Sequence, residues 1–229
     1  MITEIKTCET AQQTVDLATS KLTSSLESAL AIQKKILLLL SGGFNLKIID
    51  QIDKKLLNHQ NITSYVLDER FSKDPSLNNS LQIKEKGINV NLTVPNDQES
   101  LLEFADRFNT ELEAWLEQNP DGEIICTLGM GPDGHIAGIS PMPEDQAKFE
   151  EIFNQDRLIV GYVGNLSPAA RVTTSPNFLA KINLFIALIL GEAKKPVFDD
   201  FINKRTQPNF HPVQLLHKLS GQTIVFTDL

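Results

Sequence analysis

The sequence ILLLLSGG at residues 36–43 joins five consecutive apolar residues to a serine and two glycines. A run that is apolar on both faces is typical of a central strand in a parallel sheet, because helices cover such a sheet on both sides. The glycines that follow mark a turn into the next element. We therefore predict a buried strand at residues 36–40 that ends in a polar, glycine-rich loop.

Apolar runs and apolar residues at helical spacing alternate along the rest of the chain. We expect further strands at residues 62–67, 123–128, 157–163, 183–190 and 223–227, and helices at residues 10–34, 44–57, 97–118 and 191–203. Residues 72–79 are expected to form a loop. The alternation predicts an α/β fold, with a mostly parallel, Rossmann-like open sheet and helices on both faces. No repeat or linker divides the sequence, so we expect a single α/β domain over residues 1–229.

The composition excludes several classes of protein. Acidic residues outnumber basic ones by 29 to 21, for a net charge of -8. Nucleic-acid binding needs a broad basic surplus, whereas a small phosphorylated ligand needs only a few cations and backbone amides. Cys8 and Cys126 are too few for a disulfide framework or a structural zinc site. The apolar runs are too short to cross a membrane, and the first residues do not resemble a signal peptide. We expect a reduced, soluble, cytoplasmic protein, either a monomer or a weak dimer.

Three of the predicted strands end in unusual polar or glycine-rich loops. These loops begin at Ser41, at Asp68 and at Gly129. Ligands of open parallel sheets bind outside the carboxyl ends of the strands. We therefore expect the three loops to meet at one edge of the sheet and to form the binding site there.

The loop at residues 129–135, with the sequence GMGPDGH, carries the most chemistry. Its glycines permit close backbone approach and leave amides free for an anion or an oxyanion. Asp133 and His135 are two residues apart, so a turn lets the carboxylate orient the imidazole. A histidine has an unperturbed pKa of about 6.5, which suits a general base at neutral pH. The alternative interpretation is a tight turn that caps a helix.

Charged and amide groups elsewhere suit an anionic ligand. Ser41, Gly42 and Gly43 stand between a strand and a helix, where amides bind anions, but they lack the nucleotide-binding fingerprints. Asp68 and Arg70 place a carboxylate and a guanidinium at the sheet edge, or alternatively form an interstrand ion pair. Other candidate cations are Arg171 and Lys194, and Lys194 is unusual because a lysine in the first turn of a helix opposes the helix dipole.

Taken together, these segments resemble the 6-phosphogluconolactonase family, within the superfamily that includes glucosamine-6-phosphate deaminase. The resemblance covers nearly the whole chain and follows the family's order. It rests on LLSGG at residues 39–43, LDERF at 67–71, LGMGPDGH at 128–135, RVT at 171–173 and GEAK at 191–194. The third of these motifs is highly specific.

The resemblance implies hydrolysis of 6-phospho-D-glucono-1,5-lactone to 6-phosphogluconate in the oxidative pentose phosphate pathway, without a cofactor or a metal. Carried onto this chain, His135 is the general base that deprotonates the attacking water, and Asp133 orients it. The implied substrate-binding residues are Ser41, Gly42, Gly43, Asn45, Asp68, Arg70, Gly129, Gly131, Arg171 and Lys194. Among them, the amides of Gly42, Gly43 and the 129–131 turn hold the phosphate or the oxyanion, and the three cations clamp the phosphate.

Two departures from the family pattern keep other functions open. The family usually follows Ser-Gly-Gly with Ser-Thr-Pro, where this chain has Phe44, Asn45 and Leu46. That change motivates a sugar-phosphate sensor without turnover as one alternative. A second alternative is a glucosamine-6-phosphate deaminase or isomerase. The deaminases carry a glutamate where this chain has Ser140, before Pro141, so the residues favour the lactonase.

Overall fold

Two sheets of unequal size organise the computed structural model, which describes residues 2–91, 93–165 and 167–229. The larger sheet has six strands in the order β1-β9-β8-β5-β2-β3, and all its pairs are parallel. Its strands are β1 (Ile2–Thr7), β2 (Ile36–Leu40), β3 (Ile62–Val66), β5 (Glu123–Gly129), β8 (Leu184–Ile189) and β9 (Gln222–Thr227). The α/β class and the mostly parallel sheet are thus confirmed.

The smaller sheet is antiparallel, with the order β4-β7-β6. It consists of β4 (Asp68–Arg70), β7 (Ala170–Thr174) and β6 (Ile159–Val163). The sequence predicted a strand near β6 but gave no sign of a second sheet. It also missed β1, β4 and β7, because their charged and polar residues lack the continuous apolar pattern of a buried strand.

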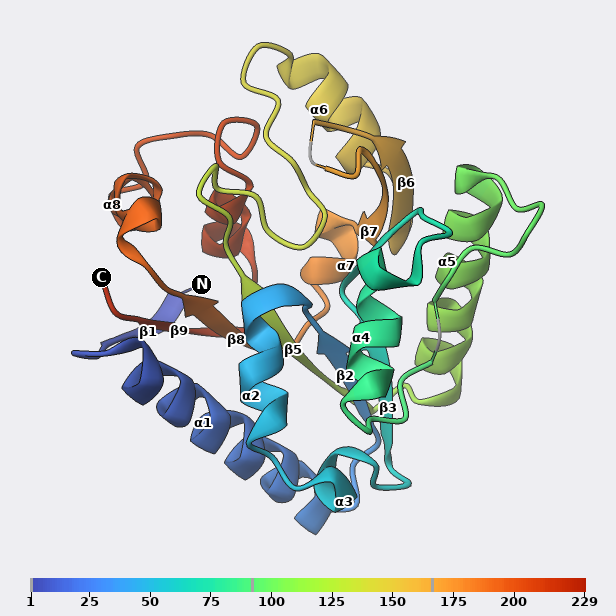
Figure 1. Cartoon of the computed structure of the whole chain (residues 1–229), viewed down its shortest axis with the longest axis vertical. Coiled ribbons are helices and arrows are strands. Elements are labelled where there is room, and N and C mark those ends of the chain that lie inside the picture. Colours follow the sequence, from blue (N-terminus) through green and yellow to red (C-terminus); the bar gives the residue numbers. More distant parts are fainter. Residues whose placement is uncertain (1, 92, 166) are drawn as a thin grey trace.

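Helices cover the sheets and connect their strands (Figure 1). The α-helices are α1 (Ala11–Ala31), α2 (Leu46–Asp50), α3 (Lys54–Leu57), α4 (Asn79–Glu85), α5 (Leu101–Gln118), α6 (Gln146–Phe153), α7 (Pro176–Leu179) and α8 (Lys195–Ile202). Short 3-10 helices are η1 (Gly43–Asn45), η2 (Pro75–Leu77), η3 (Glu192–Lys194) and η4 (Pro212–Lys218). Helix α1 packs on β8 and β9, while α5 packs on β6 and β7.

Several helix boundaries differ from the prediction for local reasons. The helix expected at residues 44–57 is divided into η1, α2 and α3, since Asp53 caps a new helix by accepting a hydrogen bond from the Lys55 amide. The helix expected at residues 97–118 begins only at Leu101, because Ser100 and Glu103 form a capping box. The segment 72–79, expected as a loop, contains η2 and the first residue of α4.

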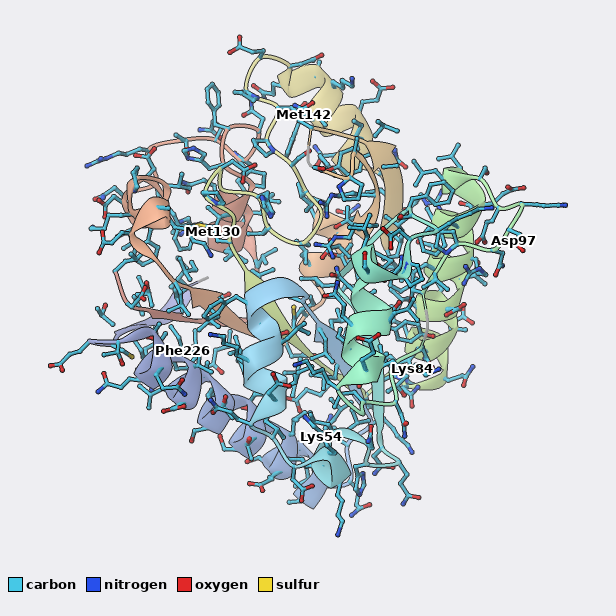
Figure 2. All side chains as sticks on the ribbon, viewed as in Figure 1. Lys54, Lys84, Asp97, Met130, Met142 and Phe226 are labelled. Carbon is cyan, nitrogen blue, oxygen red and sulfur yellow. The ribbon has the colours of Figure 1, made fainter. Side chains whose placement is uncertain are left out.

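The core lies between the large sheet and its helices. Every residue of β2 and of β8 is buried, as expected for strands covered on both faces. Met130 and Phe226 lie inside the molecule, whereas Asp97 projects from its periphery (Figure 2). Among the described residues, no helix combines the length and the apolar character needed to cross a membrane.

Candidate active site

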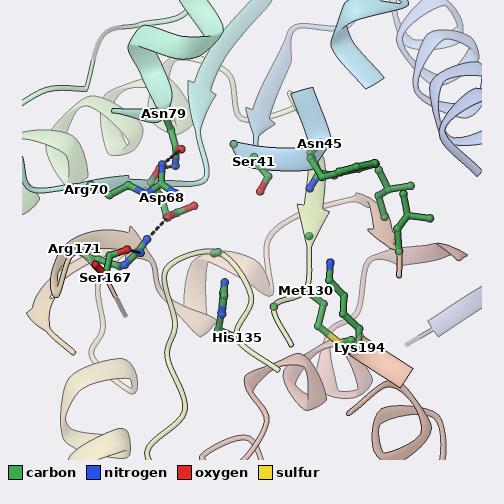
Figure 3. Close-up of a pocket in the computed structure, with 18 residues that line it drawn as sticks. Ser41, Asn45, Asp68, Arg70, Asn79, Met130, His135, Ser167, Arg171 and Lys194 are labelled. Carbon is green, nitrogen blue, oxygen red and sulfur yellow. Dashed lines mark hydrogen bonds and ion pairs between the residues drawn. The ribbon is translucent and has the colours of Figure 1, made fainter. Parts of the chain in front are cut away.

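A pocket of about 350 Å³ opens at the carboxyl ends of β2, β5 and β8 (Figure 3). The loops after β2 and β5 line it together with β4 and β7 of the small sheet. The predicted site residues that line it are Ser41, Gly42, Gly43, Asn45, Asp68, Arg70, Gly129, Gly131, His135, Arg171 and Lys194. The three loops therefore do meet at one edge, as predicted. Asp133 does not line the pocket but contacts His135.

His135 and Asp133 form a hydrogen-bonded pair beside the pocket. Nδ1 of His135 lies 2.6 Å from Oδ1 of Asp133, and the His135 amide donates to the same oxygen at 3.2 Å. Partial burial opposes ionisation of Asp133, but hydrogen bonding and the charge of His135 outweigh it and leave the pKa of Asp133 below its usual value. An ionised carboxylate only accepts hydrogen bonds, so the proton sits on Nδ1. Nε2 is then free to accept a proton.

Gly131 is required by the imidazole rather than by a ligand. A Cβ atom at this position would lie 2.1 Å from Nδ1 of His135, so any side chain would displace the ring. The Gly131 amide donates to the carbonyl of His135 at 2.9 Å. This corrects the expectation that the Gly131 amide is free to hold an anion, because the turn itself uses it.

The loop after β2 offers free amides. In the part of the chain that the structure describes, the N–H groups of Gly42 and Gly43 have no hydrogen-bond partner. The Ser41 amide, in contrast, donates to Oγ1 of Thr127 at 3.0 Å. Gly42 also permits a close contact, since a Cβ atom there would lie 2.1 Å from Oδ1 of Asn79.

The small sheet forms what we call the arginine side of the pocket: Asp68, Arg70 and Arg171. Nη1 of Arg171 lies 3.3 Å from Oδ2 of Asp68, and both side chains are over nine-tenths buried. Arg70 and Arg171 face each other in the β4–β7 register. Burial lowers the pKa of Arg171; Asp68 opposes this shift and Arg70 adds to it. Asp68 thus pairs across the strands with Arg171, a partner that the sequence did not predict, and both residues line the pocket.

Neither guanidinium of the arginine side is saturated. Nε of Arg70 and Nε of Arg171 are buried and have no hydrogen-bond partner among the described residues. Two cations against one carboxylate leave this side with a net positive charge. It therefore suits a negatively charged or strongly polarised oxygen of a ligand.

The opposite wall forms the lysine side, with Asn45 and Lys194. Figure 3 shows His135 between Arg171 on one side and Lys194 on the other. Lys194 is the N-cap residue of α8. Burial lowers the pKa of its ammonium group, and the negative charge of Asp228 partly opposes this shift. Among the described residues, this ammonium group has neither a hydrogen-bond nor an ion-pair partner. Asn45 is only 4% exposed, and its Oδ1 has no partner among the described residues.

The expectation that Arg70, Arg171 and Lys194 together clamp the phosphate stays a prediction, and the arrangement of the pocket bears on it. Arg70, Arg171 and Lys194 all line the pocket, but Lys194 and the two arginines lie on opposite sides of His135 (Figure 3). A ligand that meets all three cations therefore has polar oxygens at both of its ends.

Sequence reasoning missed Asn79, Ser167 and Met130 as lining residues. Asn79 Oδ1 accepts a hydrogen bond from Nη1 of Arg70, and its Nδ2 donates to the Asp68 carbonyl at 2.9 Å. An asparagine in a segment that looks like a loop carries no spacing signal. Only the Asn78-Asn79 pair at the end of that segment marks it, and asparagines are common at turns.

Glu69, between Asp68 and Arg70, is fully buried and faces away from the pocket. Burial raises its pKa to about 7, even though hydrogen bonds from Ser80, Asn79 and Arg70 act to lower it.

Ser140, the residue that separates the two chemistries considered above, does not face the pocket. It is fully buried, and both its amide and its Oγ lie within 3.0 Å of the Tyr162 hydroxyl. Tyr162 in turn donates to the carbonyl of Gly138. Position 140 therefore supports the path of the loop after His135 and contributes no group to the pocket.

Comparison with known proteins gives a consistent result. The family model described as glucosamine-6-phosphate isomerases/6-phosphogluconolactonase matches residues 9–225. A probable 6-phosphogluconolactonase from Dictyostelium discoideum is 27% identical over 203 residues, which cover 82% of this chain and 81% of that protein.

Solved structures share the fold. A 6-phosphogluconolactonase from Thermotoga maritima superposes with a TM-score of 0.79 at 23% identity and covers 98% of both chains. One from Shewanella baltica also has a TM-score of 0.79, at 20% identity, and covers 98% of this chain and 97% of its own.

Proposed function

Because this chain belongs to the family of glucosamine-6-phosphate isomerases and 6-phosphogluconolactonases, we propose that it hydrolyses 6-phospho-D-glucono-1,5-lactone to 6-phosphogluconate. The observation that carries the proposal is the Asp133–His135 pair, which stands between two cationic sides of one pocket. A lactone with a phosphate at its far end needs a base at the carbonyl and positive charge at both ends.

The base acts through a water molecule. Nε2 of His135 takes a proton from the water as its oxygen bonds to the lactone carbonyl carbon. The resulting tetrahedral oxyanion collapses by breaking the bond to the ring oxygen. The proton on Nε2 passes to that oxygen, which leaves as a hydroxyl group, and the product carries a carboxyl group that ionises. Asp133 holds Nδ1 throughout and stabilises the transient imidazolium.

The two sides of the pocket have different roles. The phosphate binds on the lysine side, where no carboxylate lines the pocket and the Lys194 ammonium and the Asn45 side-chain amide are donors; the free amides of Gly42 and Gly43 line the same pocket. The arginine side receives the lactone carbonyl and stabilises its developing negative charge, an effect that is often worth several kcal/mol. Ser41 and Gly129 complete the wall of the pocket.

The deaminase alternative lacks support from the site. Its chemistry uses a glutamate at the position of Ser140, and here that side chain is buried against Tyr162. No observation favours a sensor over an enzyme, since the base and both cationic sides are present together.

The first test is a coupled assay. The lactone is generated in situ from glucose 6-phosphate, and the product is oxidised by 6-phosphogluconate dehydrogenase, with enzyme-free hydrolysis subtracted. We expect a rate above background that His135→Ala lowers at least about a hundredfold, since it removes the general base. The matched control is His59→Ala, which removes a histidine outside the pocket. A folded wild-type protein with no rate above background would overturn the proposal.

A further inference from the structure

Glu69 occupies an unusual place on β4. Its neighbours Asp68 and Arg70 line the pocket, while Glu69 points to the other face of the strand, as alternation requires. There its carboxylate is fully buried, and no cation contacts it within the part of the chain that the structure describes. A buried carboxylate without a counter-ion is costly, so its hydrogen bonds must compensate.

Four hydrogen bonds converge on this carboxylate. Oε1 accepts from the amides of Arg70 and Asn79, and Oε2 accepts from the amide and the hydroxyl of Ser80, all at 2.8 Å. Three of these donors belong to the first two residues of α4. Glu69 therefore holds the start of α4 against β4.

The start of α4 in turn holds Arg70. Nη1 of Arg70 donates to Oδ1 of Asn79 and, at 3.0 Å, to the carbonyl of Leu77. The Asn79 side chain also fills the space beside Gly42. The contacts thus run without interruption from Glu69 through Asn79 to the guanidinium that lines the pocket.

We infer that Glu69 is a positioning residue: by anchoring the start of α4 it fixes the Arg70 guanidinium on the arginine side, where the reacting end of the substrate binds. This inference rests on the proposed function for the identity of that substrate. It adds a residue that touches no ligand and acts on the reacting end of the substrate through Arg70.

A carboxylate matches all four partners. All four partners are donors, and a carboxylate offers acceptors alone. A glutamine would turn an N–H₂ group toward one pair of donors, and the start of α4 would shift. An aspartate is one methylene too short to reach both residues of the helix.

The test is a double-mutant cycle with Glu69→Gln, Arg70→Ala and the double variant. The control is Glu85→Gln, the same substitution at an exposed position of α4. We expect Glu69→Gln to lower kcat/KM about tenfold, and the double variant to equal Arg70→Ala within about twofold. If the loss of kcat/KM in the double variant equals the product of the losses in the two single variants, the inference is overturned, because Glu69 then acts independently of Arg70.

Binding separates positioning from general loosening of the structure. In calorimetric titrations, Glu69→Gln should lower the affinity for 6-phosphogluconate, whose carboxylate is proposed to contact Arg70. The affinity for inorganic phosphate should not change. Equal weakening of both would overturn the inference.

If wild-type protein hydrolyses no lactone, the proposed function fails, but the two titrations still decide the role of Glu69. If Glu69→Gln does not fold, Ser80→Ala takes its place in the cycle with Arg70→Ala. Because Ser80→Ala removes only one of the four donors, it should lower kcat/KM by less than Glu69→Gln.

Discussion

Asp68 and Arg171 form an ion pair that is also part of the pocket wall. Each is buried in the pocket wall, and each depends on the other for compensation of its charge. Removing one partner of such a pair leaves an uncompensated buried charge, which usually costs more than the pair itself contributes. A test of the proposed substrate-binding role of Arg171 therefore has to include a stability measurement.

We predict that Arg171→Met lowers the free energy of unfolding by roughly 3 kcal/mol. The measurement is urea denaturation followed by circular dichroism. In the double variant Asp68→Asn/Arg171→Met most of this loss should be recovered, since no charge remains unpaired. A double variant as unstable as Arg171→Met would show that packing, not charge, accounts for the loss.

At the scale of residues, the sequence predicted which residues meet at the pocket better than it predicted their contacts. Residue types and turn glycines identified His135, Asp133 and the cations. The predicted reason for Gly131, a free amide for an anion, was wrong, since the imidazole occupies the space where a side chain would be. Such a contact depends on the path of the turn, which a list of residues does not contain.

Helix α4 links the stability of the molecule to pH through Glu69. The pKa of Glu69 is about 7 in the folded protein, against 4.5 for an exposed glutamate. Between these values the folded state binds more protons than the unfolded state. Linkage then requires the stability to fall as the pH rises.

We therefore predict that Glu69 costs the wild-type protein on the order of 3 kcal/mol as the pH rises from 4.5 to above 7. Urea denaturation of wild type and of Glu69→Gln at pH 5, 6, 7 and 8 measures this contribution as the difference between the two pH profiles. The variant should lack the decline. Parallel profiles would mean that Glu69 titrates normally.

The elements that the sequence predicted are those with a strong local signal. Strands β2, β5, β8 and β9 contain apolar runs, β3 is rich in β-branched and aromatic residues, and α1 and α5 have a clear helical period. Strand β4 is only Asp68–Arg70, and its charged residues are paired through long-range contacts. A strand of that kind is stabilised by its partners, so its own sequence gives no sign of it.

At the scale of the whole molecule, the pocket joins two sheets. The large sheet contributes the loops after β2, β5 and β8, and the small sheet contributes the arginine side. Asp68 and Arg171 are 103 residues apart in sequence. Neither periodicity nor composition could bring them together, and only the resemblance to a family placed both at one site.

A ligand that bridges both sheets should stabilise the molecule. With 6-phosphogluconate at about one hundred times its Kd, we predict a gain of about 2.7 kcal/mol in the free energy of unfolding. Thermal denaturation with and without the ligand measures it. Gluconate, which lacks the phosphate, should have little effect, and Lys194→Ala should lose most of the gain at the same ligand concentration. Equal stabilisation by gluconate would mean that the phosphate does not bind on the lysine side.

The inward turn of Ser140 has a consequence for how the two chemistries of this family can interconvert. A glutamate introduced at this position would enter the protein interior beside the Tyr162 hydroxyl, not the pocket at the sheet edge. We therefore expect Ser140→Glu alone to destabilise the protein without producing a new activity. Any route from lactone hydrolysis to amino-sugar isomerisation, in natural descent or in the laboratory, has to redirect the backbone after His135 first.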